Sequence, residues 1–163
     1  MKNLYFFIIG MICMLGIQLT IAQSDSSSLV SLNHIGISVP DIDEAVEYYT
    51  EIIGFKEAFR SRRETGETWL VYLQMSQNTF LEIQANNANQ NNEITHFGVQ
   101  VDNMDQAINF WRSRGVEVED ARKSGNSKAI LSNTYDENGI RMEIAELTPD
   151  SLPFIAMESW VQE

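Results

Sequence analysis

The chain has 163 residues, which is enough for one domain with a substantial hydrophobic core. Its formal net charge of −12 excludes nucleic acid as a partner, because so acidic a surface repels phosphate backbones. The single cysteine, Cys13, excludes an internal disulfide and any site built from several thiolates.

The N-terminal segment 1–22 has the pattern of a signal peptide, with a positive charge at Lys2 and an apolar run that ends on small residues at Ala22. We predict cleavage after Ala22, which would also remove Cys13, and then a linker over 23–30. The mature protein would be exported to the periplasm or the extracellular space. The alternative is that the run stays uncleaved and anchors the protein in a membrane.

Two segments of the chain repeat one another. The stretch LNHIGISVPDIDEAVEYY begins at Leu32, and ITHFGVQVDNMDQAINFW begins 62 residues later at Ile94. Each predicts a strand followed by an amphipathic helix, and each helix ends near a glycine. The identical pairs are His34/His96, Gly36/Gly98, Val39/Val101, Asp43/Asp105 and Ala45/Ala107.

The repeat continues into later strands. Glu67–Met75 and Ser127–Asp136 read as strands, and the motif FLEI at Phe80–Ile83 matches RMEI at Arg141–Ile144. This predicts an α+β fold of two tandem βαβββ modules that form a curved, barrel-like cleft. Module one spans 31–87, module two spans 93–147, and the segment 148–163 is predicted to form a C-terminal helix.

Strand alternation indicates where the polar side chains of the repeat point. In each first strand, the histidine lies on the face opposite the apolar residues that pack against the following helix. The glutamates of the last strands obey the same alternation. A pseudo-twofold relation between the modules would therefore bring His34, Glu82, His96 and Glu143 together in one cleft.

These features resemble the vicinal oxygen chelate superfamily, which includes glyoxalase I, extradiol dioxygenases and bleomycin-resistance proteins. The resemblance covers Leu32 to about Leu147 and rests on the repeated histidines, the matching glutamates and the YDENG turn at Tyr135–Gly139. It implies one divalent metal ion (Zn, Ni, Mn, Co or Fe) with His34, Glu82, His96 and Glu143 as ligands. The metal would stabilise an enediolate of an α-oxygenated substrate, while Glu82 and Glu143 act as catalytic residues that move a proton.

The presence of glutamate at both carboxylate positions resembles glyoxalase I and favours a metal-dependent lyase or isomerase acting on a small molecule. Two departures leave alternatives open. Epimerases of this superfamily commonly have glutamine where Glu82 stands, and Ser38 occupies the position of an arginine that binds glutathione in glyoxalase I. The alternatives are a metal-free small-molecule binding or resistance protein of the same fold, and an extradiol-type dioxygenase.

Two basic stretches, Arg60–Arg63 and Arg122–Lys128, are interpreted as solvated loops, and a guide for an anionic substrate is the alternative. Arg141, which shares a face with Glu143, is a better candidate for contact with a substrate. The superfamily pairs its modules either within a chain or across a homodimer, so both arrangements stay open at this point.

Overall fold

The computed structural model describes residues 30–87 and 92–161, so the predicted signal peptide and most of the predicted linker lie outside the described residues. The strands are β1 (Ser31–Val39), β2 (Lys56–Arg62), β3 (Thr68–Ser76), β4 (Thr79–Ala85), β5 (Glu93–Val101), β6 (Arg122–Lys123), β7 (Ile130–Tyr135) and β8 (Arg141–Glu146). The helices are α2 (Ile42–Glu47), the π-helical turn η2 (Tyr48–Ile52), α3 (Met104–Arg112) and α4 (Leu152–Glu158). No helix among the described residues is long and apolar enough to cross a membrane.

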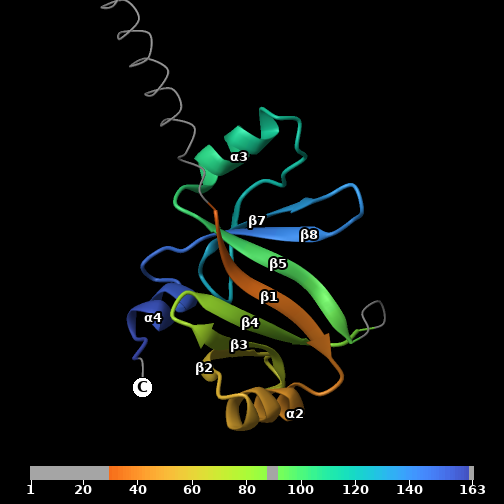
Figure 1. The fold of residues 1–163 in the computed structure, drawn as a ribbon, viewed down its shortest axis with the longest axis vertical. Helices are drawn as coiled ribbons and strands as arrows, with labels where there is room; N and C mark the ends of the chain where they lie inside the picture. The colour runs from red at the N-terminus through yellow and green to blue at the C-terminus, as the bar shows by residue number, and fades with distance from the viewer. Residues whose placement is uncertain (1–29, 88–91, 162–163) are drawn as a thin grey trace, which may run out of the picture.

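The strands form one curled, eight-stranded sheet with the order β2-β3-β4-β1-β5-β8-β7-β6. The first strands of the two modules, β1 and β5, pair antiparallel in the middle, and each pairs in parallel with the last strand of its own module. Figure 1 shows β1 and β5 side by side, with α2 and α3 at opposite ends of the molecule. The predicted fold class is therefore confirmed, and the two modules meet within one chain.

Each helix covers the face of its own module that lies away from the cleft. Ile42 and Val46 of α2 pack with buried β3 and β4 side chains such as Leu73 and Ile83. In module two, Met104 and Ile108 of α3 pack with Val99 and Ile144 in the same way. Burial of these apolar faces fixes the strand parity, because a shift of one residue would turn every side chain to the opposite face.

A side chain caps the start of α2, but the end of the helix departs from the regular helical period. Asp41 caps the helix by accepting a hydrogen bond from the Glu44 backbone N–H at 3.0 Å. A helix of regular period would put Ile53 on the buried stripe. Instead the chain widens into η2, which turns Ile53 outward so that it is 46% exposed.

The interpretation of Arg60–Arg63 as a loop is wrong, because Arg60 and Arg62 lie in β2. The Arg60 guanidinium pairs with Glu57 at 2.6 Å and with Asp43 at 3.3 Å, and these contacts hold it on the surface of module one. The strand forms because Lys56–Arg62 pairs antiparallel with β3, whose buried apolar side chains fix the position of both strands.

Helix α4 lies within the predicted C-terminal segment and packs against the cleft-side face of module one. Its Ala156 joins a buried cluster with Leu70, Tyr72 and Phe80. Gln74 strengthens this contact by donating a hydrogen bond to the Ala156 carbonyl at 3.2 Å. As a result, part of the cleft face of module one is covered by the same chain.

Candidate metal centre

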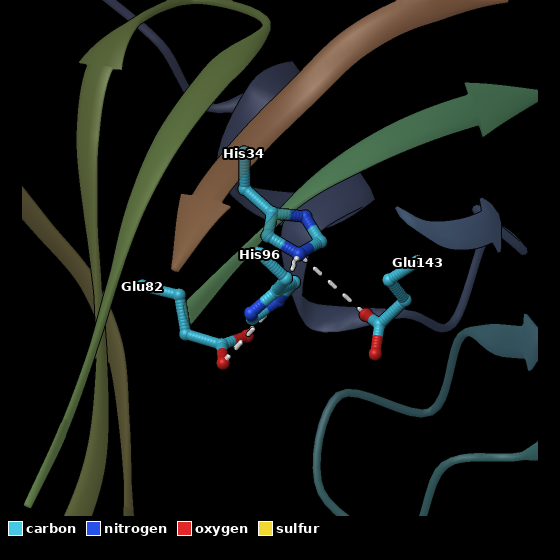
Figure 2. Close-up of side chains that lie close together, drawn as sticks. All are labelled: His34, Glu82, His96 and Glu143. Atoms are coloured by element: carbon cyan, nitrogen blue, oxygen red, sulfur yellow. Dashed lines mark hydrogen bonds and ion pairs between the residues drawn. The ribbon is translucent and has the colours of Figure 1, made fainter. Parts of the chain in front are cut away.

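The four predicted ligands lie together at the centre of the sheet. His34 and His96 project from β1 and β5, and Glu82 and Glu143 approach them from β4 and β8 (Figure 2). Each residue offers one ligand atom, and these atoms all lie within 4.8 Å of one another. All four residues are buried, with exposures between 1% and 6%.

The distances between the ligand atoms fit one divalent ion. The two Nε2 atoms are 3.0 Å apart, His34 Nε2 is 3.6 Å from Glu143 Oε1, and His96 Nε2 is 3.8 Å from Glu82 Oε1. Ligands that each bind a metal at about 2.0–2.2 Å are separated by about 3–4 Å in tetrahedral or octahedral sites. Two imidazole nitrogens and two carboxylates are also a donor set that suits divalent transition metals. The residues present can therefore hold such an ion.

The repeated glycines make room for the imidazoles. A Cβ atom at Gly36 would lie 2.1 Å from His96 Cε1, and one at Gly98 would lie 2.0 Å from His34 Cε1. Each glycine therefore accommodates the histidine of the other module. The two glycines match in the repeat, but the repeat alone does not indicate this role. Their reciprocal use depends on the register of β1 against β5, in which Gly36 lies opposite His96 and His34 opposite Gly98.

The Nδ1 atoms of both histidines are bound by neighbouring side chains, and this orients the rings with Nε2 toward the centre. His34 Nδ1 is 3.0 Å from Asn33 Oδ1, and His96 Nδ1 is 2.9 Å from Thr95 Oγ1. Asn33 and Thr95 each precede the histidine in the repeated strand. They occupy equivalent positions, so the alignment of the repeat contained a signal for them.

The two carboxylates have different surroundings. Glu82 accepts hydrogen bonds from the Tyr72 hydroxyl and from the Gln84 side-chain amide, one on each oxygen. Among the described residues, no side chain within hydrogen-bonding distance donates to Glu143, and its nearest cation is Arg141 Nη1 at 3.9 Å. Glu82 is thus fixed in place, whereas Glu143 is free to change its orientation.

Burial shifts the protonation equilibria of the site in the absence of a metal ion. It lowers the pKa of His96 to about 3, with the charge of Arg141 and then His34 adding to the effect. Burial also lowers the pKa of His34, although the charge of Glu82 opposes this. The pKa of Glu143 is raised to about 7, first by burial and then by the charge of Glu82. Both imidazoles are therefore neutral near neutral pH, as metal binding through nitrogen requires.

A cavity of about 190 Å³ adjoins the carboxylate side of the centre. Its walls include both glutamates, the Tyr72 ring and the side chains of Arg122 and Arg141. Of these residues, Arg141 is the one that the sequence indicated as a candidate for contact with a substrate. The hydrogen bond from Gln84 to Glu82 was not predicted, because alternation places both side chains on one face of β4 but does not show that they contact each other.

Comparisons with known proteins agree with the fold. The chain aligns with methylmalonyl-CoA epimerase from Mycobacterium tuberculosis with a TM-score of 0.65 and 23% identity, over 76% of this chain and 92% of that one. A variant of the Streptomyces coelicolor methylmalonyl-CoA epimerase, in complex with 2-nitronate-propionyl-CoA, aligns with a TM-score of 0.62 and 19% identity, over 76% and 99%. At these identities the likeness concerns the fold.

A shorter match is found with a 2-epi-5-epi-valiolone epimerase from an Actinomyces species, which is 37% identical over 41 residues. This alignment covers 25% of the chain and only 22% of that protein. The family model of the Glyoxalase/Bleomycin resistance protein/Dioxygenase superfamily matches residues 31–144, which is nearly all of both modules. The chain therefore belongs to the Glyoxalase/Bleomycin resistance protein/Dioxygenase superfamily.

Proposed function

We propose that the protein is a metal-dependent isomerase or lyase that removes a proton from a carbon next to a carbonyl group of a small α-oxygenated substrate. The observation that carries this proposal is the set of four buried ligands, His34, Glu82, His96 and Glu143, beside a cavity. A bound divalent ion would polarise neighbouring oxygens of the substrate and stabilise the negative charge that develops on them. The proton itself would be moved by a side chain of the site.

Glu143 is the carboxylate best suited to take the proton. It lines the cavity and is held by no hydrogen-bond donor among the described side chains, so it can turn toward a substrate carbon. Glu82 cannot turn without losing its hydrogen bonds to Tyr72 and Gln84. We therefore assign proton transfer to Glu143 and a mainly structural ligand role to Glu82.

The isomerase and lyase readings share this step and differ in where the proton returns. An epimerase must deliver a proton to the opposite face of the carbon. Glu82 lies across the site from Glu143 (Figure 2), and the Tyr72 hydroxyl donates a hydrogen bond to Glu82 on that side. The three similar proteins described above are named as epimerases, and this supports the isomerase reading. The two glutamates support the glyoxalase I-like lyase reading, although Ser38 is buried and offers no arginine for glutathione.

The first experiment measures metal content and proton exchange together. Purified protein should bind about one divalent ion per chain, and the His34→Ala/His96→Ala double variant should bind none. The loaded protein should then exchange a substrate C–H for deuterium in heavy water, monitored by NMR. The test substrates are α-hydroxy ketones, 2-oxo acids and thiol hemithioacetals of 2-oxoaldehydes.

The outcomes separate the candidate functions. Exchange with inversion at the carbon supports an isomerase, whereas conversion of a hemithioacetal to a thioester supports the lyase. A protein that binds no metal even after incubation with Zn²⁺, Ni²⁺ and Mn²⁺ would overturn the proposal and leave the small-molecule binding role. Oxygen consumption with catechols would instead indicate a dioxygenase.

A further inference from the structure

The cavity beside the metal centre is small. Its volume of about 190 Å³ lies below the range of about 300–1,000 Å³ that is usual for pockets that enclose drug-sized ligands. A substrate that fits inside would have only a few carbon atoms. Charged side chains in the wall of so small a space lie close to every part of the ligand.

Those charges are two arginines. Arg122 comes from β6 at the edge of the sheet, and Arg141 comes from β8 beside Glu143. The acidic residues of the cavity wall are the two ligand carboxylates. A divalent ion would balance these two charges, so the guanidinium groups would leave the cavity positive inside an acidic protein.

Most other cations of the described chain are already occupied by carboxylates or carbonyls. In contrast, Arg122 has no carboxylate within 4.0 Å in the part of the chain that the structure describes. It nevertheless lies near enough to Glu143 for its charge to lower the pKa of that carboxyl. The occupied cations are Arg60 with Glu57, Arg63 with Glu67, Arg112 with Asp120, Lys123 with Asp150, and Arg62 with the Gly66 carbonyl.

Arg141 has a contact that metal binding must break. Its Nη2 lies 2.6 Å from His96 Nδ1, and a guanidinium can only donate, so Nδ1 is the acceptor. The proton of neutral His96 then lies on Nε2, which faces His34 Nε2 at 3.0 Å. His96 can bind a metal through Nε2 only when its proton has moved to Nδ1. A proton on Nδ1 can be donated to Thr95 Oγ1, but it would face the N–H of Arg141, which is also a donor.

We propose that Arg122 and Arg141 bind an anionic group of the substrate, a carboxylate or a phosphate, and that Arg141 becomes available when His96 turns its Nε2 lone pair to the metal. This inference rests on the proposed metal-dependent function. It gives the substrate two parts: neighbouring oxygens that reach the metal, and an anion that the two guanidinium groups hold by charge-assisted hydrogen bonds.

Three unreactive hydroxamates test the anion directly. Acetohydroxamate, succinic monohydroxamate and phosphonoacetohydroxamate carry the same pair of metal-binding oxygens and differ in their neutral, carboxylate or phosphonate tail. Calorimetric titration of the Zn²⁺-loaded full chain should show at least one anionic tail binding about tenfold more tightly than acetohydroxamate. The tail with the larger gain identifies the anion.

Variants locate the gain. Arg122→Met and Arg141→Met keep the aliphatic stem and remove the guanidinium, and each should reduce the ratio between anionic and neutral hydroxamates severalfold. Arg114→Met, which removes the same charge outside the cavity wall, should keep the ratio. No preference for an anion, or a preference that survives both cavity variants, would overturn the inference. If acetohydroxamate itself fails to bind, the proposed metal-dependent function fails instead.

Metal affinity tests the part of the inference that concerns Arg141. Zn²⁺ should bind Arg141→Met severalfold more tightly than the wild type, because His96 Nδ1 no longer accepts a hydrogen bond from the guanidinium. Arg114→Met should leave the Zn²⁺ affinity unchanged. An Arg141→Met affinity equal to or weaker than that of the wild type would refute the competition between Arg141 and the metal.

Discussion

In module one, Glu82 lies opposite Tyr72 on the neighbouring strand and accepts its hydrogen bond. In module two, the residue opposite Glu143 is Asn133, whose amide donates instead to Glu119 at 2.7 Å. Both modules thus supply one histidine and one glutamate, but only module one fixes its glutamate. The shared residues form the candidate metal centre, and the different surroundings of the two carboxylates are the basis of the different roles that we propose for them.

The modules also differ in how they border the cavity. In module one, β2 has seven residues, and its Arg60 pairs with the carboxylates of Asp43 and Glu57. In module two, β6 has two residues, and Arg122 there faces the cavity. The cavity wall therefore receives a cation from the edge strand of module two.

The largest expected effect is a difference in proton-exchange rate between variants of the two glutamates. Glu143→Gln should lower the rate of solvent deuterium exchange by about 10²–10⁴-fold, because it removes the base. Glu82→Gln should chiefly weaken metal binding and retain exchange when metal is saturating. NMR exchange rates and metal titrations check both, with Glu137→Gln as a control in an exposed turn. Equal losses of exchange in both variants would mean that the carboxylates share the proton transfer.

A pH experiment on metal-free protein sharpens the same comparison. The pKa of Glu143 is raised from its ordinary 4.5 to about 7, so its favourable contribution to stability is complete below pH 4.5 and is lost as the pH rises through about 7. The difference corresponds to at most about 3 kcal/mol of unfolding free energy.

Denaturant unfolding of wild type and Glu143→Gln at about pH 4 and about pH 8 isolates this contribution. The stability of wild type relative to the variant should fall as the pH rises, even though the low pKa of His96, about 3, makes its own contribution change in the opposite direction. This histidine is present in both proteins and cancels in the difference. A constant difference across this range would show that Glu143 titrates normally.

The smallest expected effect concerns the packing of each repeated glycine against the histidine of the other module. Gly98→Ala places a Cβ about 2.0 Å from the buried His34 ring, and Gly36→Ala does the same to His96 at 2.1 Å. Each should cost about 1–3 kcal/mol of unfolding free energy and weaken metal binding. Gly125→Ala, with no atom within 4 Å of the added Cβ, is the matched control. Thermal unfolding and metal titration check all three, and retention of both properties by either cleft variant would contradict the reciprocal packing.

Much of the fold and the ligand set could be predicted from the sequence because both are encoded in the repeat. The spacing of His34 and His96, together with alternation along each strand, places the ligands on one face. Gln84 and Arg122 could not be assigned in this way. Their roles depend on side-chain contacts and on the length of an edge strand, and neither leaves a periodic signal. The outward turn of Ile53 could not be predicted either, since a π-helical turn interrupts the helical period.

The reciprocal packing of Gly36 against His96 and of Gly98 against His34 limits which substitutions the sequence can accept during evolution. A side chain gained at either glycine would be felt first by the opposite half of the molecule. A substitution at Gly36 or Gly98 in the first strand of one module would therefore displace the histidine of the other module. The outer strands of the two modules can accept different residues, but β1 and β5 must keep residues that fit one another.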